Sequence, residues 1–186
     1  TTEIYTLSLH DALPISLGFR EFAENRVEAA LPKIQAMGEG PRWHIIGNIQ
    51  RRKVRDVVAH FDTVDAVDRL SLAEALETRC AELDRRMPVL IEVNVSGEEA
   101  KHGFAPDAID AALEAIAAMP HIEVRGLMTM APFDAPEPML REVFSGLRAL
   151  AARHRLPELS MGMSDDYEIA IEEGATQVRI GRAFFE

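Results

Sequence analysis

The sequence has few of the features that mark secreted, membrane-spanning or nucleic-acid-binding proteins. Its 186 residues include one cysteine, Cys80, which cannot form an internal disulfide, so nothing points to an oxidising compartment. No apolar run approaches the roughly 20 residues of a membrane-spanning helix. The 20 Lys and Arg are outnumbered by 31 Asp and Glu, and the formal net charge of −11 argues against broad binding of nucleic acid. We therefore expect a cytoplasmic protein that binds neither a membrane nor nucleic acid.

Common catalytic and metal-binding signatures are missing as well. The sequence contains no HExxH, no paired CxxC, no Asp/His cluster with metal-ligand spacing and no GxSxG. Metal-dependent hydrolysis and serine-nucleophile chemistry therefore have no support, and we predict no metal site and no catalytic residue. Cys80 lies in the helical-looking run 73–83, where we expect it to pack rather than react.

What the sequence does have is enough apolar material for one globular domain. Apolar residues make up 47% of the chain and charged residues 27%. The run TLSLHDALPI (Thr6 to Ile15) resembles the translation of a sequencing-adapter oligonucleotide. We therefore treat residues 1–16 as a non-native leader and residues 17–186 as a single partial domain, with the front of the natural protein lost. The alternative is a genuine but poorly patterned terminal arm.

From Leu17 onward, short apolar strands alternate with longer amphipathic stretches, which is typical of βα units and a parallel sheet. The predicted strands are 20–22, 43–46, 63–67, 88–95, 124–130, 159–162 and 177–180. The predicted helices are 24–37, 50–60, 71–85, 106–119, 137–154 and 165–173. Seven strands with six helices between them favour a (β/α)8 TIM barrel that lacks its first βα unit and exposes the sheet edges next to the gap. An open, doubly wound sheet is the competing interpretation.

The turns after the last two predicted strands are the best candidates for a ligand site. In parallel barrels, phosphates often bind in the loops after strands 7 and 8. Ser164 offers a hydroxyl, Gly181 allows the backbone amides to approach an anion, and Arg182 adds charge. The plain alternative is that Ser164 caps a helix whose dipole Asp165 and Asp166 complement, and that Gly181 only makes a turn.

The segment RWHIIGNIQRRK (Arg42 to Lys53) combines a strand end, a glycine and a basic helix start. Three consecutive basic residues in an acidic chain are more typical of a solvated face than of a nucleic-acid site. His44 is expected to be a hydrogen-bonded histidine within a strand.

Several blocks, taken together, resemble one known family. These blocks are REFAENRVEAA, RWHIIGNIQRRK, VLIEVNVSGEEAKHGF, VRGLMTMAP and LSMGMSDDYEIAIEEGATQVRIGRAFF. In order and spacing they are similar to the signature blocks of the pyridoxal phosphate homeostasis proteins, single-domain relatives of the alanine racemase N-terminal barrel. The resemblance covers residues 18–185, and its blocks are specific only in combination.

The resemblance implies a fold-type III barrel that binds pyridoxal 5′-phosphate (PLP) and buffers or delivers this cofactor in the cell. By motif, Ser164, Gly181 and Arg182 would face the phosphate, and Arg179 would lie near the pyridine nitrogen. A positive charge there keeps that nitrogen unprotonated, which weakens the ring as an electron sink and suits a carrier. Asn25 and His44 would line the ring side of the pocket. We expect the intact parent to be a monomer or a weak dimer.

One departure from the family concerns the lysine that forms the Schiff base. In the family it belongs to an early strand block resembling AVSK, and this sequence has no such block. The three lysines present, Lys33, Lys53 and Lys101, match other parts of the family pattern, and we expect Lys53 and Lys101 to face solvent. The chain thus looks like a fragment that keeps the phosphate cradle without the covalent lysine.

Two other function classes stay open. A PLP-dependent alanine racemase would share the barrel but needs a second acid or base, often a tyrosine from another domain, and the chain has only Tyr5 and Tyr167. A barrel enzyme acting on a sugar phosphate would share the anion site without PLP. We favour the non-catalytic PLP-binding protein.

Overall fold

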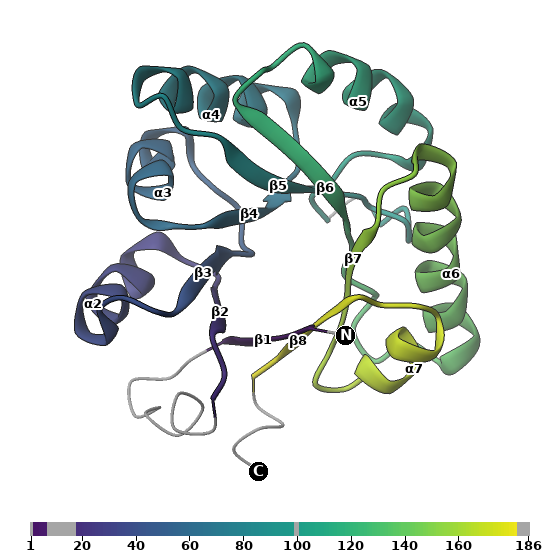
Figure 1. Cartoon of the computed structure of the whole chain (residues 1–186). Helices are drawn as coiled ribbons and strands as arrows, with labels where there is room; N and C mark the ends of the chain where they lie inside the picture. The colour runs from purple at the N-terminus through teal and green to yellow at the C-terminus, as the bar shows by residue number, and fades with distance from the viewer. Residues whose placement is uncertain (1, 7–17, 99–100, 182–186) are drawn as a thin grey trace.

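The computed structural model describes residues 2–6, 18–98 and 101–181, and its strands form a closed parallel barrel. Each strand pairs with its neighbour in sequence, and β8 returns to β1 (Figure 1). The strands are β1 (Thr2–Thr6), β2 (Glu21–Glu24), β3 (Arg42–Ile45), β4 (Thr63–Val67), β5 (Met87–Glu92), β6 (Ile122–Met128), β7 (Glu158–Met163) and β8 (Gln177–Ile180). The barrel, rather than the open sheet, is confirmed.

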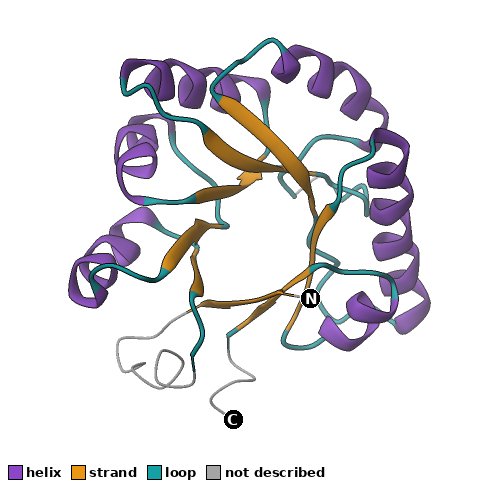
Figure 2. Ribbon diagram, in the orientation of Figure 1, coloured by secondary structure: helices purple, strands orange, loops and turns teal. Residues whose placement is uncertain are grey.

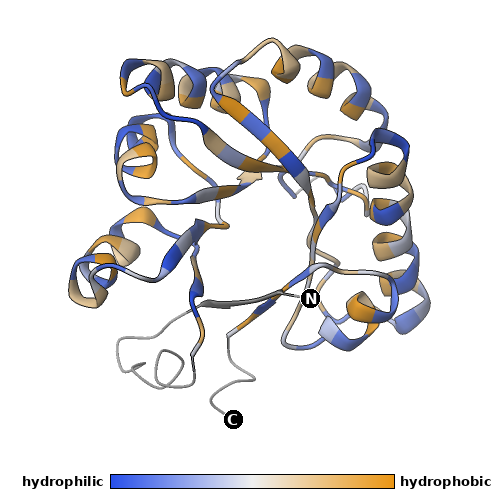
Figure 3. Ribbon diagram, in the orientation of Figure 1, coloured by the Kyte–Doolittle hydropathy of each residue, from blue (hydrophilic) through white to orange (hydrophobic). Residues whose placement is uncertain are grey.

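Helices surround the strands on the outside of the barrel (Figure 2). The helical segments are α2 (Val27–Met37), η1 (Arg51–Lys53), α3 (Val54–His60), α4 (Leu70–Glu82), η2 (Pro106–Ala108), α5 (Ile109–Ala117), α6 (Glu137–His154) and α7 (Tyr167–Glu172). Apolar and polar residues alternate along them, as the banding in Figure 3 shows, so that one stripe packs on the barrel. In the part of the chain that the structure describes, no helix is both long and apolar enough to cross a membrane.

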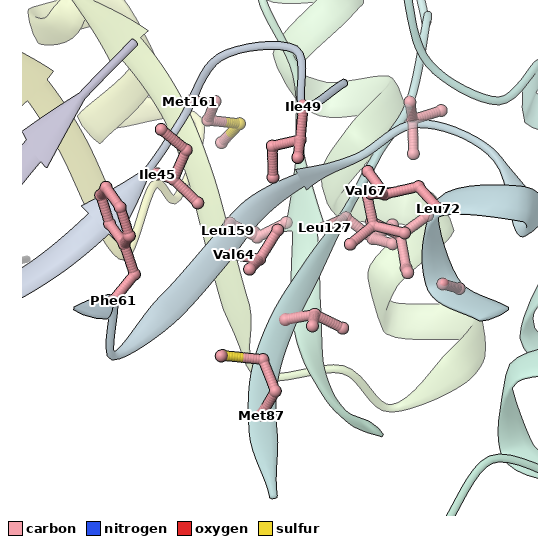
Figure 4. Packing of buried hydrophobic residues seen from close by; sticks show 14 of the residues in the cluster. Ile45, Ile49, Phe61, Val64, Val67, Leu72, Met87, Leu127, Leu159 and Met161 are labelled. Carbon is pink, nitrogen blue, oxygen red and sulfur yellow. The ribbon is translucent and has the colours of Figure 1, made fainter. Parts of the chain in front are cut away.

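The main hydrophobic core lies between the strands and the helices. Alternate residues of each strand point outward into it, as Val89 and Ile91 do on β5. Ile45, Val64 and Leu127 belong to the same cluster (Figure 4). The thiol of Cys80 is buried in this layer, as expected, and burial raises its pKa to about 11.

The residues between these outward positions face the barrel interior. Leu90 packs there against Ala66 and Met128 in a separate apolar cluster, and Glu92 follows Leu90 on the same face of β5. Polar side chains are also buried on inward positions of other strands, among them His44 on β3 and Arg179 on β8. The interior is therefore apolar in one part and charged in another.

The first strand position is filled, contrary to the expectation of unpaired sheet edges. Thr2–Thr6, which lies in the segment set aside as a leader, pairs with β2 through Tyr5 and Thr6 and with β8 through residues 2–5. Parallel pairing uses backbone amides and carbonyls, so it does not require a particular side-chain sequence. Residues 7–17 lie outside the described part of the chain.

Candidate functional site

The carboxyl ends of β7 and β8 lie side by side at one edge of the barrel. These two strands are hydrogen-bonded neighbours, and Met163 pairs in register with Arg179. Ser164 follows Met163 directly, and Gly181 stands two residues after Arg179, so both belong to the same edge. Both are half-buried. The strand pairing thus brings together two of the residues predicted to face a phosphate, while Arg182 lies outside the described residues.

Ser164 is not the cap of the helix that follows it. Asp166 holds the N-cap position of α7, and its Oδ1 accepts a hydrogen bond from the backbone N–H of Met163 (2.6 Å). The Asp166 side chain therefore closes the turn that contains Ser164. This geometry corrects the alternative in which Ser164 served only as a helix cap.

Arg179 lies inside the barrel with only 4% of its surface exposed. Its guanidinium donates one hydrogen bond to Ser160 Oγ (2.7 Å) and another to the backbone carbonyl of Thr129 (2.9 Å). These two contacts link the guanidinium of β8 to β7 and to the end of β6, inside the barrel. A guanidinium has five N–H donors, so others can serve a ligand.

Three carboxylates act on Arg179. Burial lowers its pKa, and the charges of Asp65, Asp166 and Glu92 oppose that effect. Burial raises the pKa of Asp166, and it raises the pKa of Glu92 to about 7, with Asp68 adding to the rise and Arg179 opposing it. The interior therefore combines the buried Arg179 cation with two acids, Glu92 and Asp166, that burial makes costly to ionise.

His44 lies closer to the amino ends of the strands than Ser164 and Gly181 do. It pairs in register with Thr63, the first residue of β4. Its Nδ1 lies 3.0 Å from Asp65 Oδ2, and its Nε2 lies 2.8 Å from Glu21 Oε2. Burial opposes a charge on the ring, but the two carboxylates raise the pKa of His44 to about 10. His44 is the hydrogen-bonded strand histidine that the sequence indicated, and its contact with a cofactor ring stays a prediction.

Asn25 lies on the rim, immediately after β2, and is exposed. The backbone of the next loop passes very close to it, because a Cβ added to Gly47 would stand 2.1 Å from the carbonyl oxygen of Asn25. The loops after β2 and β3 are therefore packed backbone to backbone. The predicted contact of Asn25 with a ligand stays open.

The loop after β5 connects two sides of the rim. On one side, the Nδ1 atom of His102 in this loop lies 3.5 Å from Oδ2 of Asp68, which follows β4. The same Asp68 oxygen accepts a hydrogen bond from Nδ2 of Asn48, which follows β3 (2.9 Å). Lys101 Nζ donates to the backbone carbonyl of Met130 (3.2 Å) on the other side. The loop thus reaches both β4 and β6 above the interior.

The lysines are less exposed than the sequence suggested. The side chains of Lys53 and Lys101 are 23% and 22% exposed. Each lysine has a carboxylate partner: Lys33 with Glu24, Lys53 with Glu28 (2.6 Å) and Lys101 with Glu98 (2.8 Å). None of the three lies on a described strand.

A cavity of about 160 Å³ adjoins the site, bordered by the loops after β6 and β7, including Phe133, Met163 and Asp166. A larger one, of about 520 Å³, lies over α6 and is lined by residues such as Val95, Met139 and Val143. The larger cavity is mostly apolar and does not include the buried cation, so the carboxyl edge of β7 and β8 stays the candidate site.

Sequence reasoning missed the carboxylates around Arg179. Glu92 stands in the otherwise apolar run VLIEV, and a charge on an inward strand position was the available signal. Asp65 stands in the equally buried run TVDAV. Neither run of residues shows that its carboxylate interacts with Arg179 from the opposite side of the barrel.

Comparisons with known proteins place the whole described barrel in one family. The family described as "Alanine racemase, N-terminal domain" matches residues 3–186. The pyridoxal phosphate homeostasis protein of Pseudomonas aeruginosa is 44% identical over 172 residues, which cover 90% of this chain and 74% of that protein. The protein of the same name from Escherichia coli K12 is 40% identical over 184 residues, covering 92% and 77%.

Comparison with solved structures points to the same family. PipY of Synechococcus elongatus PCC7942 without PLP superposes with a TM-score of 0.92 at 34% identity, covering 99% of this chain and 92% of that one. PipY with PLP bound gives a TM-score of 0.89 at 32% identity and the same coverage. Alanine racemase from Corynebacterium glutamicum shares the fold, with a TM-score of 0.78 at 21% identity over 56% of its length. The chain therefore belongs to the pyridoxal phosphate homeostasis proteins, within the alanine racemase N-terminal domain family.

Proposed function

We propose that this chain binds pyridoxal 5′-phosphate at the carboxyl edge of β7 and β8 and acts as a non-catalytic carrier or buffer of the cofactor. The observation that carries the proposal is that Ser164 and Gly181 directly follow two hydrogen-bonded strands, and that the Arg179 guanidinium is buried inside the barrel on one of them. PipY, whose structure with PLP bound superposes on this chain, supports the choice of ligand.

The donors present suit the phosphate and the ring of this cofactor. The Ser164 hydroxyl and the Gly181 amide are of the kind that hold a phosphate dianion, and Gly181 has no side chain to block its approach. Arg179 has N–H donors to offer the pyridine nitrogen, which accepts a hydrogen bond. Arg182 is proposed to add charge at the phosphate, with Asn25 and His44 on the ring side.

When bound, PLP supplies an aldehyde and an electron-accepting ring. The residues of this chain bind and orient it: the loop after β7 holds the phosphate, and the guanidinium keeps the ring nitrogen unprotonated by charge repulsion. No described strand presents a lysine, so we propose that binding is non-covalent and weaker than in a chain that has one. That arrangement favours holding and release over turnover.

A racemase needs two groups that exchange a proton with the substrate. Tyr167, one of the two tyrosines, lies half-buried on α7 against the hydrophobic core, with its hydroxyl 3.4 Å from Glu168 Oε1. The structural likeness to alanine racemases covers about half of those chains and shows the fold alone. We therefore prefer the carrier, located in the cytoplasm as a monomer or weak dimer.

Titration calorimetry tests the proposal by comparing PLP with pyridoxal, which lacks the phosphate. We expect PLP to bind at least tenfold more tightly, since the cradle recognises the phosphate. Ser164→Ala and Arg179→Lys should each weaken PLP binding, while Ser71→Ala, a change on an exposed position of α4, should leave it unaltered. Equal affinity for both ligands, or binding unaffected by either site variant, would contradict the proposal.

A further inference from the structure

Glu92 is a buried acid for which the proposed function has not yet given a role. It ends β5 and is 4% exposed. Its neighbours Ile91 and Val93 face the helices, so its side chain faces the barrel interior, one step beyond Leu90 and its apolar cluster. Among residues 2–6, 18–98 and 101–181, no group makes a hydrogen bond or an ion pair with its carboxylate. A carboxylate without partners in such a place favours its neutral form.

The groups around Glu92 come from several elements. Asp68, just after β4, repels a negative charge on Glu92, and Arg179 on β8 attracts it. On β6, the residue in register is the apolar Met128. In the loop after β5, the Nδ1 atom of His102 lies 3.5 Å from Asp68 Oδ2, and Lys101 pairs with Glu98. Asp65 and Asp166 also interact with the Arg179 guanidinium, so the positive charge of Arg179 is shared among three acids rather than directed to Glu92 only.

We propose that Glu92 acts as a proton-linked determinant of affinity, holding a proton while a phosphate-bearing ligand is bound and weakening its retention when ionised. This inference rests on the proposed function, because it assigns a regulating group to the same site. The proton comes from solvent, and the step is simple association: carboxylate and proton give the neutral acid. A dianion at the site adds negative charge to an interior that already contains acids, so binding favours this uptake.

The expected change in ligand affinity with pH follows from the titration of Glu92. Burial raises its pKa to about 7, so the acid changes state across neutral pH. If the bound state requires the neutral acid, affinity falls by up to about tenfold for each pH unit above that value. Near neutral pH, the free chain would take up part of one proton on binding.

Pyridoxine 5′-phosphate is the appropriate probe, because it carries the phosphate and the ring but no aldehyde to react with lysines. Titration calorimetry at pH 6 and pH 8, in buffers of different ionisation enthalpy, measures both the affinity and the protons taken up. The ligand's own ionisations are common to all variants. We compare the wild-type chain with Glu92→Gln, Glu92→Asp and the control Glu114→Gln, which makes the same charge change at an exposed position of α5.

We expect the wild-type affinity to fall about tenfold more between pH 6 and pH 8 than that of Glu92→Gln, and every chain except Glu92→Gln to show the extra proton uptake. Glu92→Asp, which keeps the titrating group, should retain the pH dependence even if Glu92→Gln folds poorly. Equal pH profiles for wild type and Glu92→Gln would overturn the inference while leaving the proposed function intact. If the wild type binds neither this probe nor PLP, the proposed function itself fails and the inference with it.

Discussion

His44 on β3 and Asp65 on β4 form an ion pair inside the barrel, with Nδ1 3.0 Å from Oδ2. Glu21 on β2 completes the arrangement at 2.8 Å from Nε2. Hydrogen bonding to His44 in turn lowers the pKa of Glu21. The imidazole is therefore charged at neutral pH and links three successive strands, β2, β3 and β4.

Because of this cluster, the free energy of unfolding should fall as the solution becomes alkaline. The folded-state pKa of His44, about 10, lies above its ordinary value of 6.5. Its stabilising contribution is thus fully present below pH 6.5 and is lost as pH rises through 10. Urea unfolding at a series of pH values should show this loss in the wild type and a flatter profile in His44→Asn.

At pH 7, His44→Asn should also lower the free energy of unfolding by about 3–5 kcal/mol, because it leaves buried Asp65 without its cation. His60→Asn is the matched control, since His60 is exposed on α3 and bonds only locally to the Asp56 carbonyl. A parallel pH profile for wild type and His44→Asn would show that the imidazole is not charged in the folded state.

Gly47 is required by the close approach of two rim loops. In Gly47→Ala the new Cβ would meet the Asn25 carbonyl oxygen at 2.1 Å, and both groups belong to the backbone. We expect a loss of about 1–3 kcal/mol in the free energy of unfolding, measured in urea, together with weaker PLP binding.

Gly146→Ala provides the comparison for this change. Its Cβ would lie 3.1 Å from a methyl group of Val95, a side chain that can adjust, and the position is inside α6. Alanine there also favours the helix by roughly 0.5–1 kcal/mol, so we expect a change within about 1 kcal/mol of zero. Equal losses in the two variants would contradict the close approach at Gly47.

Cys80 should be unreactive in the native chain. Its thiol is buried under α4, and burial raises its pKa to about 11, so little thiolate exists at pH 8. Ellman's reagent should titrate no thiol in buffer and one thiol in denaturant. Rapid reaction of the native chain would place Cys80 on an accessible surface.

After incubation with PLP, borohydride reduction should not produce a covalent PLP–lysine adduct at one specific lysine of the pocket. Lys53 and Lys101 are held by Glu28 and Glu98, and neither lies on a strand. Peptide mass spectrometry of the reduced sample distinguishes the outcomes. A stoichiometric adduct at either lysine would contradict the proposed non-covalent binding.

Much of the fold could be predicted from local pattern. The expected strands 63–67 and 177–180 and the helix 137–154 coincide with β4, β8 and α6. Each combines a clear hydrophobic period with a definite boundary, such as Pro136 at the N-cap of α6. The adjacency of the carboxyl ends of β7 and β8 also followed, because neighbouring parallel strands end at one edge.

The charged interior could not be predicted in the same way. Asp65 and Arg179 are more than a hundred positions apart, and only the closure of the barrel lets one charge act on the other. The strand at Thr2–Thr6 was missed for a different reason: residues 1–16 were set aside as a leader because of the adapter-like run, yet the backbone of this segment pairs with β2 and β8.

In β1, closing the barrel and presenting a reactive side chain are two separate roles. Completing the ring of amide-to-carbonyl bonds between β8 and β2 asks only for an extended chain, which TEIYT provides. Presenting an amine to an aldehyde asks for one specific side chain. A first strand without lysine can therefore close the barrel while offering no amine to an aldehyde.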